Sequence, residues 1–317
     1  MVKIIFNALL GLLLIFIWSR FVNIEEIFHT ISKVNPLSLI PIFFFLLLSP
    51  IIRSIRLKIF LSEIKKISLK DLIMLNGAAL MLNFLIPIRA GEIAKGVYLS
   101  QKYGLNLGKA VIWVFIDRFV DFLVVLLLAS LFVSLLPTQL PSGFSKTALV
   151  IFILALLGTY LVVFQINLSR KIASFLPFKK LSHFMLDSFT ILDRHPRDLF
   201  LMILTTLLAY LADAFILYYG FKAVGYNEDI LRMYFAQLLT ALTYLIPAAP
   251  GFVGSAEASG LLVFSGIFGI DPNISSSVVV LLHISTILFV LVFGIIGVLN
   301  LKLDLGLILR KALKRDK

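Results

Sequence analysis

Six long apolar runs dominate the chain and predict helices that cross a membrane. They cover residues 4–21, 37–52, 111–136, 148–166, 199–221 and 278–299. A helix needs about 20 apolar residues to cross a hydrocarbon core about 30 Å thick, and each run approaches or exceeds that length. The pattern therefore predicts an all-α polytopic membrane protein with about six full transmembrane helices, the second of them interrupted by Pro41 and Pro50.

Two shorter apolar runs end at a proline and predict re-entrant hairpins. Residues 72–86 comprise 15 residues, about 22 Å of helix, and stop at Pro87, whereas residues 231–246 comprise 16, about 24 Å, and stop at Pro247. Both are too short to cross comfortably. We expect each run to turn at its proline and to return to the same side, which gives Pro-broken hairpins at 72–99 and 231–269.

The two hairpins end their first arms alike, which indicates an internal repeat. The sequences are Leu82-Asn-Phe-Leu-Ile-Pro87 and Leu242-Thr-Tyr-Leu-Ile-Pro247, and they lie 160 residues apart. The repeat predicts a first half at 1–136, a second half at 145–301 and a basic tail at 302–317, all within a single transmembrane domain that spans residues 1–317.

The distribution of basic residues predicts the orientation. With both hairpins re-entrant, 23 of the 29 Lys and Arg residues lie on the predicted cytoplasmic side, including Arg53 and Arg56, and five lie outside. Lys and Arg accumulate on the cytoplasmic side of membrane proteins. We therefore expect both termini to be cytoplasmic, with the first hairpin opening from the cytoplasm and the second from the outside, as in an inverted repeat.

Composition agrees with a membrane protein and excludes several functions. The chain is 60% hydrophobic and 15% charged, with a mean hydropathy of +1.05. It has no cysteine, and its four histidines lack ligand spacing, so we expect no metal and no cofactor. The net charge of +12 fits loops that face an anionic leaflet, and no separate basic region predicts nucleic-acid binding. No phosphate-binding loop of an ATP-driven pump occurs.

Charged residues beside the first proline break are candidate binding residues. Glu92 has Arg89 three residues before it and Lys95 three residues after it, a spacing that allows an ion pair on a helix. Helices interrupted at matching places in two inverted halves are typical of transporter binding sites. We therefore expect Arg89 and Glu92 to contact a substrate.

A second group of charges lies inside the run 111–136. Asp117, Arg118 and Asp121 occupy its first turns, and charges at membrane depth persist when they are paired. The group is either a neutralising structural cluster or a site where Arg118 offers its guanidinium to a lipid phosphate. Asp213 lies near the middle of its own run without a nearby cation, so it needs a distant partner, either Arg118, Arg89 or a substrate amine.

The second proline break leads to an isolated carboxylate. Glu257 has no cation near it in the sequence, which makes it a candidate proton-linked switch, although a capped helix end at the membrane interface fits equally. His283 is expected to make an interhelical hydrogen bond. The residues expected to let the hairpins move are the prolines and glycines of the two breaks: Pro87, Gly91, Pro247, Pro250, Gly251 and Gly254.

Three motifs together resemble a known family. They are Leu82-Asn-Phe-Leu-Ile-Pro-Ile-Arg-Ala-Gly-Glu92, then Asp117-Arg-Phe-Val-Asp121, then Pro250-Gly-Phe-Val-Gly-Ser-Ala-Glu257. In this order they resemble the lysylphosphatidylglycerol synthase transmembrane region, a family of flippase-like membrane proteins. The resemblance covers nearly the whole chain. It implies a plasma-membrane protein whose relatives include some that move aminoacylated or polyprenyl lipids between leaflets.

The resemblance also implies which residues are characteristic and where this chain departs from the pattern. The characteristic positions are Arg89, Glu92, Arg118, Asp121, Gly251 and Glu257. Phe252 replaces the second glycine of the family's P-G-G stretch, and no synthase domain follows residue 299. Lipid aminoacylation by this chain alone is therefore not expected, and a separate cytosolic transferase is left as a partner.

The sequence thus favours a multi-pass, flippase-like protein that binds or translocates an anionic or isoprenoid-linked lipid, with membrane lipids as its partners. Two alternatives stay open. One is a membrane-embedded transferase subunit for lipid-linked sugars or amino acids, with Glu92 or Asp121 as general base. The other is a non-transporting scaffold that presents its basic tail.

Overall fold

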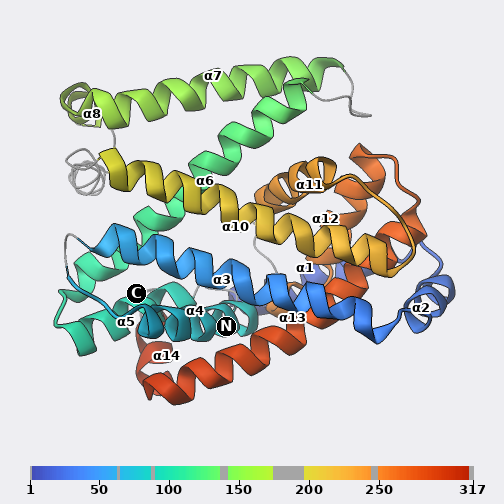
Figure 1. Cartoon of the computed structure of the whole chain (residues 1–317), viewed down its shortest axis with the longest axis horizontal. Coiled ribbons are helices and arrows are strands. Elements are labelled where there is room, and N and C mark those ends of the chain that lie inside the picture. The colour runs from blue at the N-terminus through green and yellow to red at the C-terminus, as the bar shows by residue number, and fades with distance from the viewer. Residues whose placement is uncertain are drawn as a thin grey trace.

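The computed structural model describes residues 2–62, 65–86, 90–135, 142–173, 196–243 and 249–313, and its regular elements in these ranges are helices (Figure 1). Their bounds are α1 (Val2–Trp18), α2 (Ile24–Ser32), η1 (Pro36–Ser38), α3 (Leu39–Leu61), α4 (Leu69–Leu85), α5 (Ala90–Tyr103), α6 (Leu107–Leu135), α7 (Ser142–Phe164), α8 (Ile166–Ala173), α10 (Pro196–Ala223), α11 (Ile230–Thr243), η2 (Pro250–Phe252), α12 (Ser255–Gly260), η3 (Leu261–Ile267), α13 (Pro272–Leu301) and α14 (Leu305–Leu313).

The predicted all-α membrane architecture is confirmed at the level of secondary structure and length. Within the described ranges, three helices are long and apolar enough to cross a membrane: Pro36–Leu61, Arg197–Ala223 and Pro272–Leu301. The helices α6 and α7 have 29 and 23 residues. Large apolar side chains cover much of the outer surface, as expected where lipid replaces water around a helix bundle.

The pair formed by α3 and α10 runs through the bundle, where the two helices pack along each other (Figure 1). Phe45 of α3 stacks on Phe215 of α10 with 4.7 Å between ring centroids. Around this pair, α4 packs along α13, and α11 packs along α6. The first helix of each hairpin therefore lies against the long helix that follows the other hairpin.

Helix α3 is longer than predicted, and this overturns one assignment. The prediction ended the helix at residue 52, but α3 continues through Pro50 to Leu61. Proline removes one backbone hydrogen bond from a helix without necessarily ending it. One turn after Pro50, the Ser54 hydroxyl donates to the Pro50 carbonyl oxygen at 2.7 Å. Arg53 and Arg56 consequently lie inside the helix, whereas the prediction placed them in the basic stretch that follows it; the side of the membrane on which they lie stays a prediction.

The two predicted hairpins appear as pairs of short segments. In the first, α4 and α5 meet at Gly91, where an added Cβ would lie 2.1 Å from the Ala79 carbonyl oxygen, so only glycine fits. In the second, α11 is followed by η2, α12 and the π-helical segment η3. Gly251 and Gly254 turn the chain into α12 with φ of +70° and +81°, conformations that favour glycine. Pro87, Arg89 and Pro247 lie outside the described residues.

Glycines also bring α4 and α13 together. At Gly297 an added Cβ would lie 2.3 Å from the Met74 carbonyl oxygen, and at Gly294 it would lie 2.3 Å from the Met81 Cβ. Small residues let membrane helices approach closely enough for backbone contact. The first arm of the first hairpin is thus held against the long helix of the second half.

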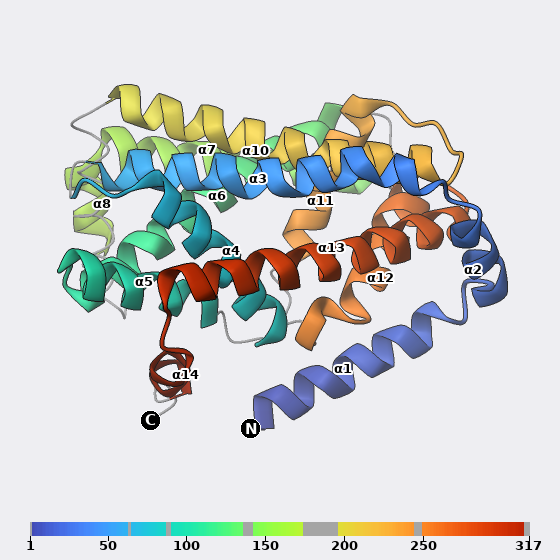
Figure 2. The ribbon, with the colours of Figure 1, turned by 60° about the horizontal axis from the view of Figure 1, so that its bottom comes forward.

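Part of the predicted basic tail is a folded element. Helix α14 packs on α5, and its Ile308 is only 1% exposed in the cluster formed with the first hairpin. Figure 2 shows α14 at one end of the bundle and α2 at the other. The beginning of the tail therefore belongs to the fold rather than extending freely from it.

Candidate functional site

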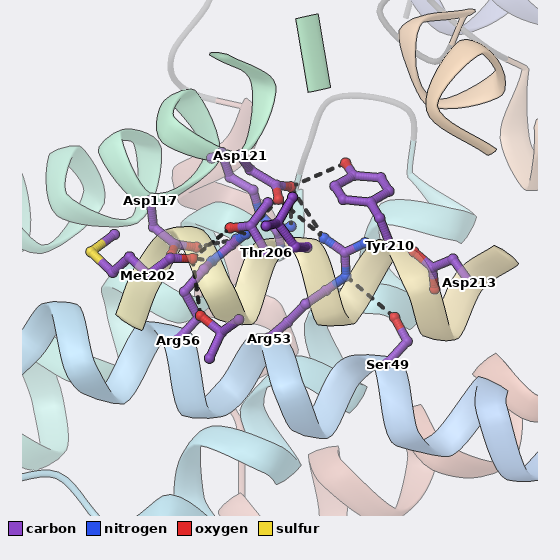
Figure 3. Close-up of polar contacts among 12 residues, drawn as sticks. Ser49, Arg53, Arg56, Asp117, Asp121, Met202, Thr206, Tyr210 and Asp213 are labelled. Atoms are coloured by element: carbon purple, nitrogen blue, oxygen red, sulfur yellow. Dashed lines mark hydrogen bonds and ion pairs between the residues drawn. The ribbon is translucent and has the colours of Figure 1, made fainter. Parts of the chain in front are cut away.

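A buried arginine of α3 binds the two aspartates of α6. Arg56 has a fully buried side chain, and its Nε and Nη2 donate to the two carboxylate oxygens of Asp117 at 2.9 and 3.0 Å (Figure 3). Its Nη1 donates to Asp121 and, at 3.0 Å, to the Thr206 hydroxyl of α10. A bidentate arginine–carboxylate contact is among the strongest polar contacts in proteins. Arg56 therefore joins α3, α6 and α10.

A second arginine of α3 connects the same cluster to Asp213. Arg53 Nη2 donates to Asp213 Oδ2 at 2.7 Å, and its Nη1 donates to Asp121 Oδ2 at 3.1 Å. Figure 3 shows the guanidinium between these carboxylates, next to the Tyr210 ring, whose centroid lies 4.8 Å from the Arg53 Cζ. The distant partner that Asp213 needs is therefore Arg53, which was not among the candidates expected from the sequence.

Glu92, in the first turn of α5, brings the first hairpin to this cluster. Arg118 Nε lies 3.4 Å from Glu92 Oε1, and Lys95 Nζ lies 3.5 Å from Glu92 Oε2. Asn83 of α4 donates to Glu92 at 3.3 Å and accepts from the Gly91 N–H at 2.8 Å. The hairpin tip and α6 are thus joined through one carboxylate.

The cluster holds four basic and four acidic side chains in close contact. They are Arg53, Arg56, Lys95 and Arg118 with Glu92, Asp117, Asp121 and Asp213. Such a balance lowers the cost of placing charge in a bundle surrounded by lipid. Burial is uneven: the side chain of Arg56 is 0% exposed, whereas that of Arg118 is 26% exposed and lies 3.7 Å from Asp121. Arg118 is therefore the cation of the cluster most open to a ligand.

Glu257 lies in a separate polar site of the second hairpin. Its Oε1 lies 2.6 Å from His283 Nδ1 of α13, and its Oε2 accepts from the Gly254 N–H at 2.7 Å. The other ring nitrogen of His283 lies 2.7 Å from the Gly251 carbonyl oxygen. The interhelical hydrogen bond predicted for His283 is present, and its partner is the carboxylate that lacked a nearby cation in the sequence.

The structure thus divides the predicted residues into two sites. Glu92, Asp117, Arg118, Asp121 and Asp213 come together, whereas Glu257 belongs with Gly251 and Gly254 around His283. In the described part of the chain, no ion pair or hydrogen bond joins Glu257 to the first cluster. A role for Arg89 stays a prediction, because that residue is outside the described ranges.

Comparison with known proteins agrees with the three motifs. The profile of the lysylphosphatidylglycerol synthase TM region matches residues 4–294. The chain belongs to this family. It is also similar to the UPF0104 membrane protein MJ1078 of Methanocaldococcus jannaschii, with 25% identity over 227 residues, which cover 68% of this chain and 92% of the relative. No solved structure matches the chain.

For this member of the lysylphosphatidylglycerol synthase TM region family, sequence analysis missed Arg53 and Arg56. Two signals were available. Four carboxylates within apolar stretches cannot be balanced by Arg118 and Lys95 alone. In addition, the buried positions of α3 continue at helical spacing beyond residue 52, as Arg56, Leu57, Phe60 and Leu61 show. Either signal places the arginines on the inner face of a longer helix.

Proposed function

We propose that this protein binds an anionic or isoprenoid-linked lipid through its phosphate and moves it between the leaflets of the plasma membrane. The proposal rests on the partial exposure of Arg118 and on its long ion-pair distances. Its guanidinium is partly exposed and lies 3.4 and 3.7 Å from its two carboxylates, distances longer than those of close hydrogen-bonded pairs. A phosphate that displaced Glu92 from Arg118 would gain charge-assisted hydrogen bonds.

Lys95 supports the same assignment. Its side chain is 2% exposed, and it lies 3.5 Å from Glu92, so it compensates this carboxylate when Arg118 turns to a phosphate. The exchange keeps each buried charge paired, which an uncompensated movement of Arg118 would not. Glu92 therefore acts as the group that holds Arg118 between binding events.

The order of the helices supports two related halves that alternate. Two short helices, α4 and α5, lie between the long helices α3 and α6, and a comparable run of short elements, α11, η2, α12 and η3, lies between the long helices α10 and α13. Each half packs against the other, because α4 lies along α13 and α11 lies along α6. We propose that these halves form an inverted repeat with six full crossings, two re-entrant hairpins and both termini in the cytoplasm.

Transferase chemistry is less well supported by the same contacts. A general base needs a carboxylate with a free lone pair near the substrate. Asp121 is bound by Arg53, Arg56 and Arg118, which leaves it poorly placed to accept a proton. Glu92 is held between Lys95 and Arg118.

The test is translocation by purified protein in liposomes that contain fluorescent anionic, zwitterionic or polyprenyl-phosphate lipids. We expect faster exchange than in protein-free liposomes for lipids that carry a net negative phosphate, and loss of that exchange in Arg118→Gln. The matched control is Arg310→Gln, which alters an exposed arginine of α14 that binds the Gly306 carbonyl. Equal rates for Arg118→Gln and wild type would contradict the assignment of Arg118.

A further inference from the structure

His283 lies between two hydrogen-bond acceptors, which fixes the number of protons that it carries. Its Nε2 is 2.7 Å from the Gly251 carbonyl oxygen, and its Nδ1 is 2.6 Å from Glu257 Oε1. A carbonyl oxygen only accepts, so Nε2 must bear a hydrogen. A singly protonated ring of this tautomer would turn the Nδ1 lone pair toward the carboxylate.

Two lone pairs cannot face each other at 2.6 Å without a proton between them. The observed geometry therefore contains one proton shared by Nδ1 and Oε1, in addition to the hydrogen on Nε2. When that proton leaves, the ring is neutral, the carboxylate is charged, and their contact becomes repulsive. The pair thus holds one proton whose loss would change the Nδ1–Oε1 contact.

The Glu257–His283 pair has a counterpart in the first hairpin. That counterpart is the Glu92–Arg118 pair, whose arginine cannot release a proton. Glu92 and Glu257 are both in the first turn of the helix that follows the break, α5 and α12 respectively. The basic partner comes from the next long helix, and in both cases it lies 26 residues after the glutamate, as Arg118 and His283. Arginine stays charged at all pH values that proteins tolerate, whereas histidine changes its charge near neutral pH.

We propose that His283 and Glu257 form a proton-binding site, and that loading and release of this one proton drive the movement of the second hairpin. With the proton bound, the pair carries an imidazolium and a carboxylate, as the Arg118–Glu92 pair carries a guanidinium and a carboxylate. Without it, the contact between Glu257 of the second hairpin and His283 of α13 becomes repulsive, while the Nε2–H bond to Gly251 remains. The coupling of this site to lipid movement rests on the proposed function, whereas the proton site itself does not.

The contacts around the pair connect its proton to the turn between the two arms. His283 Nε2–H holds the Gly251 carbonyl, and Glu257 holds the Gly254 N–H, so the shared proton joins the Gly254 end of this turn to α13. Gly254 itself lies against α1, because an added Cβ would be 2.1 Å from the Gly11 carbonyl oxygen. Loss of the proton therefore weakens one of the contacts that fix this turn and leaves the bond to the Gly251 carbonyl in place.

Other charged groups near α13 do not compensate the pair. Of the described residues, Glu257 is the only charged side chain that forms an ion pair or hydrogen bond with His283, and α4 presents the Phe84 ring at 6.2 Å. The charged residues of α3 and α10 inside the bundle, Arg53, Arg56 and Asp213, are bound within the first cluster. On α2, Glu26 binds Asn273, ten residues before His283. Among the described residues, the net charge of the Glu257–His283 site therefore depends only on whether the shared proton is bound.

The direct test is nitrogen-15 NMR of the His283 ring in purified protein labelled at histidine. The other three histidines, His29, His183 and His195, are replaced by Gln so that one ring is observed. We expect a doubly protonated ring at low pH, a change to the singly protonated Nε2–H form as pH rises, and a lower midpoint in Glu257→Gln. A ring that is neutral throughout, or a midpoint unaffected by Glu257→Gln, would overturn the proposal.

The second measurement concerns coupling and uses lipid exchange at a series of pH values. His283→Arg cannot release a proton, so it should abolish exchange between about pH 5.5 and 8.5, whereas Arg118→His should give an exchange rate with a new pH dependence. The matched control is His29→Arg on the exposed face of α2, which should keep the wild-type profile. A wild-type profile in His283→Arg would overturn the coupling. A titrating ring in protein that moves no lipid would refute the proposed function and the coupling, and leave the proton site intact.

Discussion

The ion pair between Arg56 and Asp117 offers a quantitative test of the first cluster. Arg56→Met removes a fully buried guanidinium that donates to both oxygens of Asp117 at 2.9 and 3.0 Å. Asp121 keeps Arg53 at 3.1 Å, but Asp117 loses the partner that these bonds provide. Breaking a buried pair by removing one member costs about 3 to 5 kcal/mol, because a buried charge is left uncompensated. We expect a loss of that size.

Removing the second charge should restore most of the stability. In Arg56→Met combined with Asp117→Asn, the cluster again has equal numbers of positive and negative side chains. We expect the double variant to lie within about 2 kcal/mol of wild type, since replacing both members of a buried pair is often close to neutral. The free energy of unfolding is measured in mixed micelles by the fluorescence of Trp18 and Trp113.

The double-mutant cycle then separates the ion pair from other effects of each substitution. The matched control is Arg310→Met at an exposed position of α14, which should change the free energy of unfolding by about 0.5 kcal/mol or less. If the two substitutions are additive, or if Arg56→Met alone costs less than about 1 kcal/mol, the cluster does not contain a buried, interdependent pair.

Three further predictions use the same unfolding assay. Asp213→Asn should cost about 1 to 3 kcal/mol, because Arg53 loses a carboxylate at 2.7 Å, whereas Glu25→Gln on exposed α2 should have little effect. Gly297→Ala should cost about 1 to 3 kcal/mol because its Cβ meets the Met74 carbonyl, whereas Gly158→Ala, with open space around it, should be neutral or stabilising; equal effects would contradict the close α4–α13 contact. Outside the three spanning helices, burial alone would raise the pKa of Asp71, but hydrogen bonds from Lys102 and Tyr103 outweigh it and lower that pKa. A lowered pKa in the folded state adds stability above about pH 4, and this stability is lost as pH falls through the lowered value. Asp71→Asn should therefore be less stable than wild type at pH 7, and the difference in the free energy of unfolding should shrink in acid. A difference that stays constant with pH would refute this.

The sequence predicted those parts of the fold that depend on local pattern. The apolar runs became helices close to the expected ranges, since run length and helix length are directly related. The first short arm, α4, ends at Leu85, one residue before its predicted end, and the D-R-x-x-D spacing placed Asp117, Arg118 and Asp121 together on α6. These are properties of residues near one another in the chain.

Long-range pairing was not accessible in the same way. Arg53 and Arg56 follow an apolar run, and basic residues in that position are usually at the membrane surface. Their burial depends on Asp117, Asp121 and Asp213, which come from two other helices. His283 and Glu257 are 26 residues apart, and only the packing of α12 against α13 shows that they meet.

Our proposal is that both hairpins take part in one cycle of lipid movement. It is tested most directly by measuring lipid exchange in liposomes that contain Glu92→Gln or Glu257→Gln, with the fluorescent lipid placed initially in either leaflet. Glu228→Gln serves as the control, because Glu228 binds Arg232 of α11 and belongs to neither site. We expect Glu92→Gln and Glu257→Gln each to abolish exchange in both directions. Exchange at the wild-type rate in either one would contradict it.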